Sequence, residues 1–319
     1  MLANIQTRIS NLPMILQKKL PMVIGAVVIG IGIGFALGTN FETKQVATIV
    51  APVTISPFEN ISLVAKSAAV YDLTTEKLLF EKNSHAQLPL ASLTKLMTAL
   101  AATEKVGGNY IVSIPESVLS GGDRTSLVAK EDWKLSDLID QTLVSSSNVG
   151  AVAIASTVGL EDDTHTPVSA FVKSMNDLAT TIGLSETYYI NPTGLDESGN
   201  LAGSYGSALD VTKLLSYIAK NEPTMIRATS LTKLTTESES KEKHFATNTN
   251  LSVRSLPFLV GGKTGLTDLA GGNLAVIFDI APNHPVAAVV LGSSEKSRFD
   301  DIEKLVDKTL EINGLVTKK

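Results

Sequence analysis

The chain predicts an α+β fold, in which helices flank one antiparallel sheet and a helical region separates its strands along the sequence. Two apolar, β-branched runs, at 273–280 and 284–291, are typical of neighbouring strands. Another strand-like segment lies much earlier, at 69–80, and apolar residues at helical spacing occur between them. Strands from both ends of the chain therefore meet in one sheet, with the helices packed on it.

The composition excludes several classes of function. The 319 residues include no cysteine, so neither a disulfide framework nor a thiol nucleophile is available. A formal net charge of -5 and the lack of a basic stripe argue against nucleic-acid binding. The four histidines lack the spacing of a zinc site, and we expect no metal or other cofactor. The charged run at 235–244 reads as a solvated loop.

An apolar segment near the start predicts a membrane anchor. Residues 20–38 carry no charge, follow Lys18 and Lys19, and come close to the roughly 20 residues that span a bilayer. We expect 1–19 to stay in the cytoplasm, 39–60 to form a linker, and the domain 61–319 to lie outside the cell membrane. The alternative is a cleaved signal peptide and a secreted domain, although the apolar core exceeds the usual length of about 7–15 residues.

The string Ser92-Leu93-Thr94-Lys95 opens a predicted helix that begins after Pro89. Residues three apart share a helix face, so the Lys95 amine can reach the Ser92 hydroxyl. A serine needs a base to become a nucleophile, and a buried lysine can be that base. The Ser92 N–H has no partner within the first turn and can bind an oxyanion. The alternative is that Ser92 only caps the helix.

The string Ser146-Ser147-Asn148 lies in a predicted turn between two helices. From this turn, Ser146 can relay a proton toward a leaving nitrogen, and Asn148 can hold an amide of a substrate and contact Lys95. Serine and asparagine also commonly cap helices, and without the other two strings capping would be the favoured interpretation.

The string Lys263-Thr264-Gly265 lies on a predicted strand whose glycines let a ligand backbone approach closely. A peptide can add to such an edge, with Lys263 and Thr264 holding a terminal carboxylate. The N–H of Leu266 is a second candidate donor to an oxyanion. A phosphate loop is the alternative, but Phe258 occupies its first glycine position and no helix follows.

Together and in this order, the three strings resemble the serine-type D-alanyl-D-alanine carboxypeptidases, which are the low-molecular-mass penicillin-binding proteins of peptidase family S11. The resemblance runs from about Ser67 to about Ser294 and includes the stretches 69–80, 91–99 and 191–196. It implies a penicillin-binding-protein/β-lactamase-like transpeptidase fold with an all-helical subdomain. Carried over by position, Ser92 is the acylated nucleophile, Lys95 its base, Ser146 and Asn148 the second motif, and Lys263, Thr264 and Gly265 the third.

The resemblance also implies a reaction and its partners. The enzyme would remove the terminal D-alanine from peptidoglycan stem peptides that end in D-Ala-D-Ala, and β-lactam antibiotics would acylate Ser92. An endopeptidase that cleaves D-alanyl cross-links would use the same residues and stays open. A class A β-lactamase needs a Glu-x-x-Leu-Asn string, which is absent between Asn148 and Lys263. A penicillin sensor without turnover is disfavoured, because residues 1–19 leave no room for a signalling domain.

Overall fold

The computed structural model describes residues 57–58, 60–121, 126–159 and 166–315. The expected cytoplasmic segment 1–19, the membrane anchor 20–38 and most of the linker 39–60 lie outside these residues. No helix among the described residues is both long and apolar enough to cross a bilayer. The elements below all belong to the compact unit that starts at Ile55.

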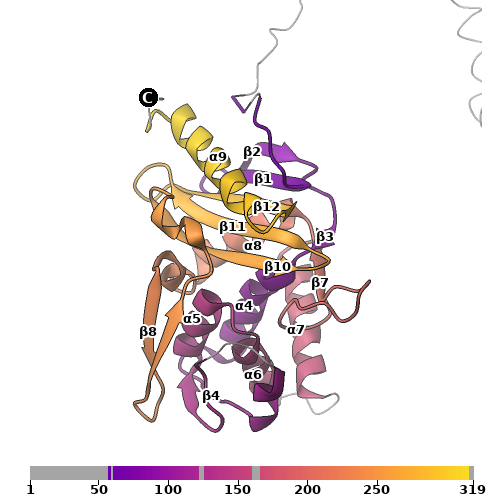
Figure 1. Ribbon diagram of the computed structural model, residues 1–319, viewed down its shortest axis with the longest axis vertical. Coiled ribbons are helices and arrows are strands. Elements are labelled where there is room, and N and C mark those ends of the chain that lie inside the picture. Colours follow the sequence, from indigo (N-terminus) through magenta and orange to yellow (C-terminus); the bar gives the residue numbers. More distant parts are fainter. Residues whose placement is uncertain (1–56, 59, 122–125, 160–165, 316–319) are drawn as a thin grey trace, which may run out of the picture. The chain divides into compact units, whose positions relative to one another are not determined.

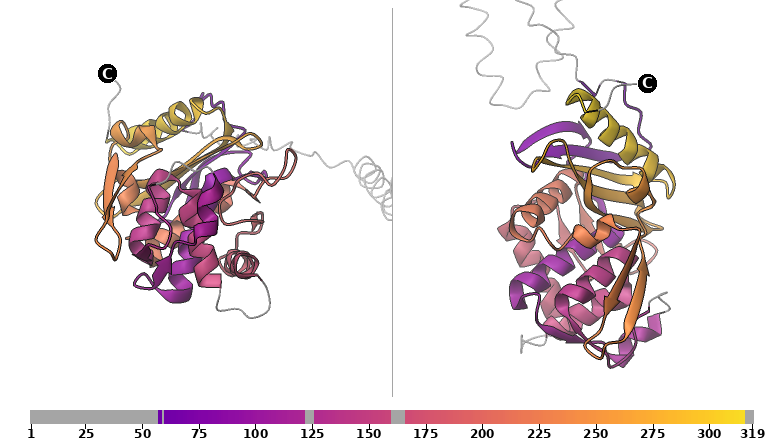
Figure 2. Two further views of the ribbon diagram at one scale, coloured as in Figure 1. Left: turned by 60° about the horizontal axis from the view of Figure 1, so that its bottom comes forward. Right: turned by 90° about the vertical axis from the view of Figure 1, so that its left-hand side faces the viewer.

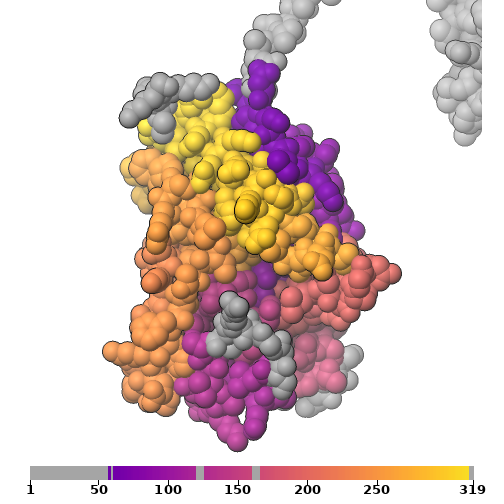
Figure 3. Space-filling view, viewed as in Figure 1, coloured from indigo at the N-terminus to yellow at the C-terminus, as the bar shows by residue number. Residues whose placement is uncertain are grey.

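A five-stranded antiparallel sheet runs through this unit in the order β10–β11–β12–β1–β2 (Figure 1). Among the described residues, the first strand pairs with the last, with Ala69 opposite Val289. The segments near both ends consequently lie side by side, indigo next to yellow in Figure 3. This confirms the predicted antiparallel sheet. Its strands are β1 (Ser67–Asp72), β2 (Lys77–Lys82), β10 (Leu259–Thr267), β11 (Gly271–Asp279) and β12 (Pro285–Ser293).

Helices cover both faces of the sheet, which explains why β11 is continuously apolar from Leu274 to Phe278. Leu274, Val276 and Phe278 belong to one buried cluster, and Ala275 and Ile277 belong to the other, as alternation along a strand requires. The first cluster packs against α9 (Ser297–Ile312), and the second packs against α4 (Thr94–Val106) and α8 (Ala208–Asn221). Figure 2 shows α9 on one side of the sheet and the other α-helices on the opposite side.

The region between β2 and β10 is mainly helical, as predicted, but it is not all-helical. Its helices are α5 (Leu135–Ser145), α6 (Asn148–Val158) and α7 (Pro167–Thr181), together with α4 and α8. The short helices η1 (Ala91–Leu93), η2 (Glu116–Gly121), η4 (Arg227–Ser230) and η5 (Leu251–Arg254) connect longer elements. Short strands complete it: β3 (Leu88–Pro89), β6 (Tyr188–Tyr189) and β7 (Ser204–Gly206) form one sheet, and β4 (Ile111–Ser113) pairs with β5 (Asp132–Lys134).

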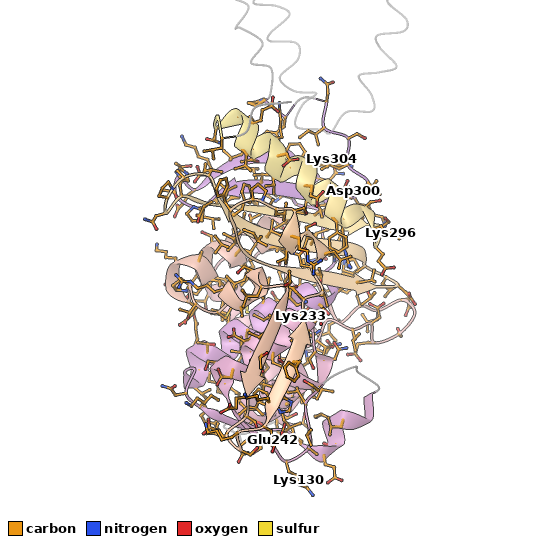
Figure 4. The ribbon with its side chains drawn as sticks, turned by 60° about the vertical axis from the view of Figure 1, so that its left-hand side comes forward. Lys130, Lys233, Glu242, Lys296, Asp300 and Lys304 are labelled. Carbon is orange, nitrogen blue, oxygen red and sulfur yellow. The ribbon has the colours of Figure 1, made fainter. Side chains whose placement is uncertain are left out.

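The prediction of a solvated loop at 235–244 is wrong. The segment contributes to a hairpin of β8 (Lys233–Glu237) and β9 (Lys243–Thr247), which Figure 4 shows between the labelled Lys233 and Glu242. One face of this hairpin is buried: His244 is enclosed, and the Thr236 hydroxyl donates to Gln141 Oε1 of α5 at 3.1 Å. The many charges on the outer face hide this two-residue alternation in the sequence.

The carboxylate of Asp301 ties the two ends of the unit together. It is fully buried on α9 and accepts hydrogen bonds from the N–H groups of Val64 and Ala65, at 3.0 and 2.8 Å, and from the Ser293 hydroxyl at 2.7 Å. Substitution of this residue would leave those donors without their acceptor, and burying an unsatisfied donor is costly.

We therefore expect Asp301→Ala to lower the free energy of unfolding by about 2–3 kcal/mol, measured by urea denaturation. Asp300→Ala is the matched control, because this neighbouring side chain is exposed on α9 (Figure 4) and its loss should cost less than about 1 kcal/mol. Equal losses for the two variants would contradict the role of Asp301.

A second carboxyl predicts how stability depends on pH. Burial, and to a lesser extent the Asp137 charge, raises the pKa of the Asp140 carboxyl on α5 to about 6. The folded state thus holds this proton more tightly than the unfolded state. The stabilisation is fully present below the unfolded pKa of 3.8 and is lost as the pH rises through about 6.

Asp140→Asn should consequently raise the free energy of unfolding by about 1–2 kcal/mol at about pH 8, a value reduced for partial solvent access. At about pH 4 the variant and the wild type should have nearly the same stability, because both side chains are then neutral. Urea denaturation at the two pH values checks this. A gain of the same size at both would show that ionisation is not the cause.

Candidate active site

Ser92 lies at the N-terminal entrance of a deeply buried helix. It belongs to η1, which runs directly into α4, and every residue of α4 from Thr94 to Ala102 is buried. Ala91 has a positive φ of 50°, a conformation that is uncommon for a residue with a side chain. The core thus holds the Ser92 hydroxyl in a fixed position while the residue itself stays partly accessible.

The Lys95 amine is completely buried and lies among three oxygen atoms. Its Nζ is 2.8 Å from Ser92 Oγ, 2.7 Å from Asn148 Oδ1 and 2.9 Å from the Thr193 carbonyl oxygen. As an ammonium, the group donates to all three acceptors. As a neutral amine, it donates to Asn148 and Thr193 and keeps its lone pair for the Ser92 O–H. This geometry allows Lys95 to accept the serine proton.

The turn between α5 and α6 presents Ser146 and Asn148 to the same site. Ser146 is the C-cap of α5 and has a left-handed φ of 60°, while Ser147 caps α6 by accepting a hydrogen bond from the Gly150 N–H. Asn148 is the first residue of α6 and faces Lys95. The capping role thus falls on Ser147, and the side chains on either side of it turn toward the two lysines.

Lys263 approaches from the sheet. Its Nζ donates to Ser146 Oγ at 2.8 Å and to the Thr264 carbonyl oxygen at 2.9 Å. Burial and the charges of Lys95 and Arg298 hold the pKa of the Lys263 ammonium well below its usual range. Two buried amines thus face two partly accessible serines, Lys95 beside Ser92 and Lys263 beside Ser146.

Strand β10 forms one edge of the sheet, and its outward hydrogen-bonding groups alternate. The Gly262 N–H points away from β11 and donates to Thr229 Oγ1 at 2.9 Å. By the same alternation, the main-chain groups of Thr264 and Leu266 also point outward, where an added peptide strand could pair with them. The Thr264 hydroxyl is 2.6 Å from that of Thr249.

Gly265 lets β10 lie close to η1, the short helix that carries Ser92. A Cβ atom at this position would be 2.8 Å from the Leu90 carbonyl oxygen and 3.2 Å from the Ala91 Cβ. Asn273 of β11 strengthens the same contact by donating to the Pro89 carbonyl oxygen at 2.9 Å. All eight predicted site residues therefore come from elements that meet around Ser92: η1 and α4, the α5–α6 turn, and β10.

The loop after β6 is a part of the site whose role the sequence did not indicate. Its Asn191 side chain accepts hydrogen bonds from the Thr193 and Gly194 N–H groups, which shapes the turn and points the Thr193 carbonyl at Lys95. Gly194 has a φ of 78°, and a Cβ there would come within 1.9 Å of the Ala91 carbonyl oxygen. Asp196 fixes the loop to the sheet by accepting from Thr267 Oγ1 and the Leu269 N–H.

Two further residues near the third motif were also missed. Thr249 contacts the Thr264 hydroxyl, and Arg298 donates from Nη1 to the Gly265 carbonyl oxygen at 2.7 Å. Neither belongs to a local motif, so no signal in the sequence joins them to the site. Among the described residues, no group of three histidine, aspartate or glutamate side chains is arranged to hold a metal ion.

A pocket of about 330 Å³ borders the site on the side of Asn148 and Thr193. Its apolar wall comes from valines on η2, α6 and α7, and the loop 191–197 supplies polar groups at its rim. The combination is suited to a peptide with both apolar and polar parts. The wall consists of Val118, Val149, Val152 and Val168.

Curated relatives include enzymes with two named activities. The D-alanyl-D-alanine carboxypeptidase DacF of Bacillus subtilis is 31% identical over 256 residues, which are 76% of this chain and 61% of that protein. The D-alanyl-D-alanine endopeptidase of Escherichia coli is 28% identical over 278 residues, and the match covers 84% of each chain. The chain thus spans less than two thirds of the first relative and most of the second.

Solved structures of a penicillin-binding protein and of a D-alanyl-D-alanine carboxypeptidase have the same fold. Penicillin-binding protein D2 of Listeria monocytogenes, in its ampicillin-bound form, superposes with a TM-score of 0.63 at 30% identity and covers 78% of this chain and 98% of that one. DacD of Francisella tularensis gives a TM-score of 0.70 at 24% identity, covering 80% and 72%. The predicted penicillin-binding-protein fold is thus confirmed for the described residues.

The family model of peptidase family S11, described as D-alanyl-D-alanine carboxypeptidase, matches residues 53–295. This match includes all three motifs and both ends of the five-stranded sheet. The chain therefore belongs to the D-alanyl-D-alanine carboxypeptidase family of serine hydrolases.

Proposed function

We propose that this enzyme removes the terminal D-alanine from peptidoglycan stem peptides that end in D-Ala-D-Ala, and that it does so through an acyl-enzyme on Ser92. The observation that carries the proposal is the position of Lys95, whose Nζ lies 2.8 Å from Ser92 Oγ and is held there by Asn148 and Thr193. A hydroxyl and a buried amine at hydrogen-bonding distance form a nucleophile and its base.

Acylation begins when neutral Lys95 takes the proton of the Ser92 hydroxyl. Ser92 Oγ then attacks the carbonyl carbon of the penultimate D-alanine, and the N–H groups of Ser92 and Leu266 stabilise the oxyanion. As the tetrahedral intermediate collapses, the C–N bond breaks, and the proton passes from Lys95 through Ser146 to the departing nitrogen. The 2.8 Å contact between Lys263 and Ser146 orients this hydroxyl for the transfer.

Residues of β10 bind the departing D-alanine. Lys263 and Thr264 lie on the edge strand of the sheet and offer an amino group and a hydroxyl to the terminal carboxylate. The peptide pairs with the outward main-chain groups of Thr264 and Leu266, and Asn148 holds an amide on the acyl side. Water then hydrolyses the ester and releases the shortened stem peptide. A β-lactam presents a similar carbonyl and carboxylate and acylates the same serine.

An endopeptidase that cleaves D-alanyl cross-links is the second candidate. Two curated relatives named for this activity match 84% and 85% of this chain, whereas the carboxypeptidase DacF matches 76%. The chemistry at Ser92 is identical for both substrates, so the difference rests on whether the site accepts a large departing group. The exposed Leu266 side chain borders the edge where that group would lie.

We further propose that the domain acts outside the cytoplasmic membrane, anchored by residues 20–38. The substrate class supports this location, because peptidoglycan is assembled there, and so does the uncharged segment that follows Lys18 and Lys19. The mass of the N-terminal peptide of the mature protein distinguishes an anchor from a cleaved leader.

Ser92→Ala should abolish labelling by a fluorescent penicillin and lower D-alanine release by about a million-fold, by analogy with another serine hydrolase. Circular dichroism should show an unchanged fold, because the side chain is small and only partly buried. Ser240→Ala is the control, since this exposed serine lies between β8 and β9. Persistent labelling of the Ser92 variant would refute the assignment.

The two candidate activities are separated by their products. With diacetyl-Lys-D-Ala-D-Ala, we expect stoichiometric release of D-alanine, measured with a coupled amino-acid oxidase. With purified cross-linked muropeptide dimers, we expect much slower conversion to monomers, measured by chromatography. Rapid cleavage of dimers with no release from the pentapeptide mimic would instead establish the endopeptidase.

A further inference from the structure

We infer that Arg298 is a positioning residue for the oxyanion site, because it clamps the peptide group that carries the Leu266 N–H. The inference rests on the proposed acyl-enzyme chemistry and adds a residue that lies outside the three motifs. Arg298 is the second residue of α9, behind the edge strand, and its Nη1 donates to the Gly265 carbonyl oxygen at 2.7 Å across 33 residues of sequence.

The geometry of one peptide group links Arg298 to the site. The Gly265 carbonyl and the Leu266 N–H belong to the same trans peptide, so they point in opposite directions. The Gly262 N–H points to the open edge, and alternation along β10 places the Leu266 N–H on that edge too. The Arg298 guanidinium therefore binds the carbonyl oxygen of this peptide group, while the N–H on its opposite side faces the substrate.

Besides the Gly265 carbonyl, the Arg298 guanidinium has the Phe299 ring at 4.8 Å and the charge of Glu295 as favourable partners, but other features of its surroundings disfavour a cation. The residue is 93% removed from solvent, its buried Nε finds no hydrogen-bond partner among the residues that the structure describes, and burial lowers the pKa of its guanidinium. It also lies in the first turn of α9, where the helix dipole disfavours positive charge. Local rules are typically broken in this way where function requires it.

A cation on the carbonyl end of a peptide has two effects on the N–H at the other end. It draws electron density toward the oxygen, so the N–H becomes a stronger donor, and this effect is larger in a region of low dielectric. It also fixes the plane of the peptide, so the N–H needs no reorientation when the oxyanion forms. Both effects act on the developing charge and are therefore realised in the transition state rather than in substrate binding.

The test compares Arg298→Met, which keeps the length of the side chain without its charge, with Arg298→Lys, which restores the charge. Arg254→Met is the control, because this arginine is exposed on η5. We expect Arg298→Met to slow acylation by a fluorescent penicillin, and kcat for D-alanine release, by about 10- to 100-fold. KM should stay within about twofold, the Lys variant should recover part of the rate, and the control should match the wild type.

A spectroscopic readout separates this role from a merely structural one. Oxyanion donors weaken the ester C=O bond of the acyl-enzyme, so its infrared stretching band should move to higher frequency in the penicillin adduct of Arg298→Met and partly return in the Lys variant. An unchanged band in either variant, or a loss confined to KM, would overturn the inference. If the Met variant fails to fold, the Lys variant must still show an intermediate shift and rate.

This test is separable from that of the proposed function. Acylation rate and ester band are both measured on the penicillin adduct, whereas the proposed function requires release of D-alanine. A wild-type enzyme that is acylated but releases no D-alanine would refute the proposed function and leave the inference on Arg298 fully testable.

Discussion

The burial of two amines within one site is the constraint on which the rest of the structure depends. Lys95 and Lys263 are both almost completely enclosed, and the oxygens that receive their hydrogen bonds belong to hydroxyl, amide and backbone carbonyl groups. Removing an ammonium from water is costly unless such dipoles are already in place. The neighbouring elements therefore each present an oxygen to one of the amines. The two ammonium charges also repel one another, which favours loss of a proton from one of them.

The site lies where the sheet meets the helical region, and a few polar side chains hold these two parts in register. Asn273 is fully buried, donates to the Pro89 carbonyl, and accepts from the Gly292 N–H. Asp196 fixes the loop 191–196 to the end of β10. Gly265 and the residues before Ser92 then pack so closely that a methyl group would have no room. Small errors in this packing would move the edge strand away from Ser92.

Much of the sheet and the residues of the candidate site could be predicted from the sequence, because strands and motifs both leave local patterns. The runs at 273–280 and 284–291 mark strands by composition, and the spacing of Ser92 and Lys95 marks a shared helix face. The contribution of Thr193 could not be predicted, since a carbonyl acceptor belongs to the backbone and any residue could supply it. Arg298 reaches the site only through the packing of α9 on the sheet.

The pairing of β1 with β12 has a consequence for the order in which the protein matures. The last motif ends at Gly265 on the edge strand β10. This strand pairs with β11, β11 pairs with β12, and β12 pairs with β1, which is synthesised long before the other three. Contacts between residues so distant in sequence form late, after loop-closure entropy has been overcome. A nascent or shortened chain that already contains all three motifs would therefore stay inactive until β12 pairs with β1 and β11.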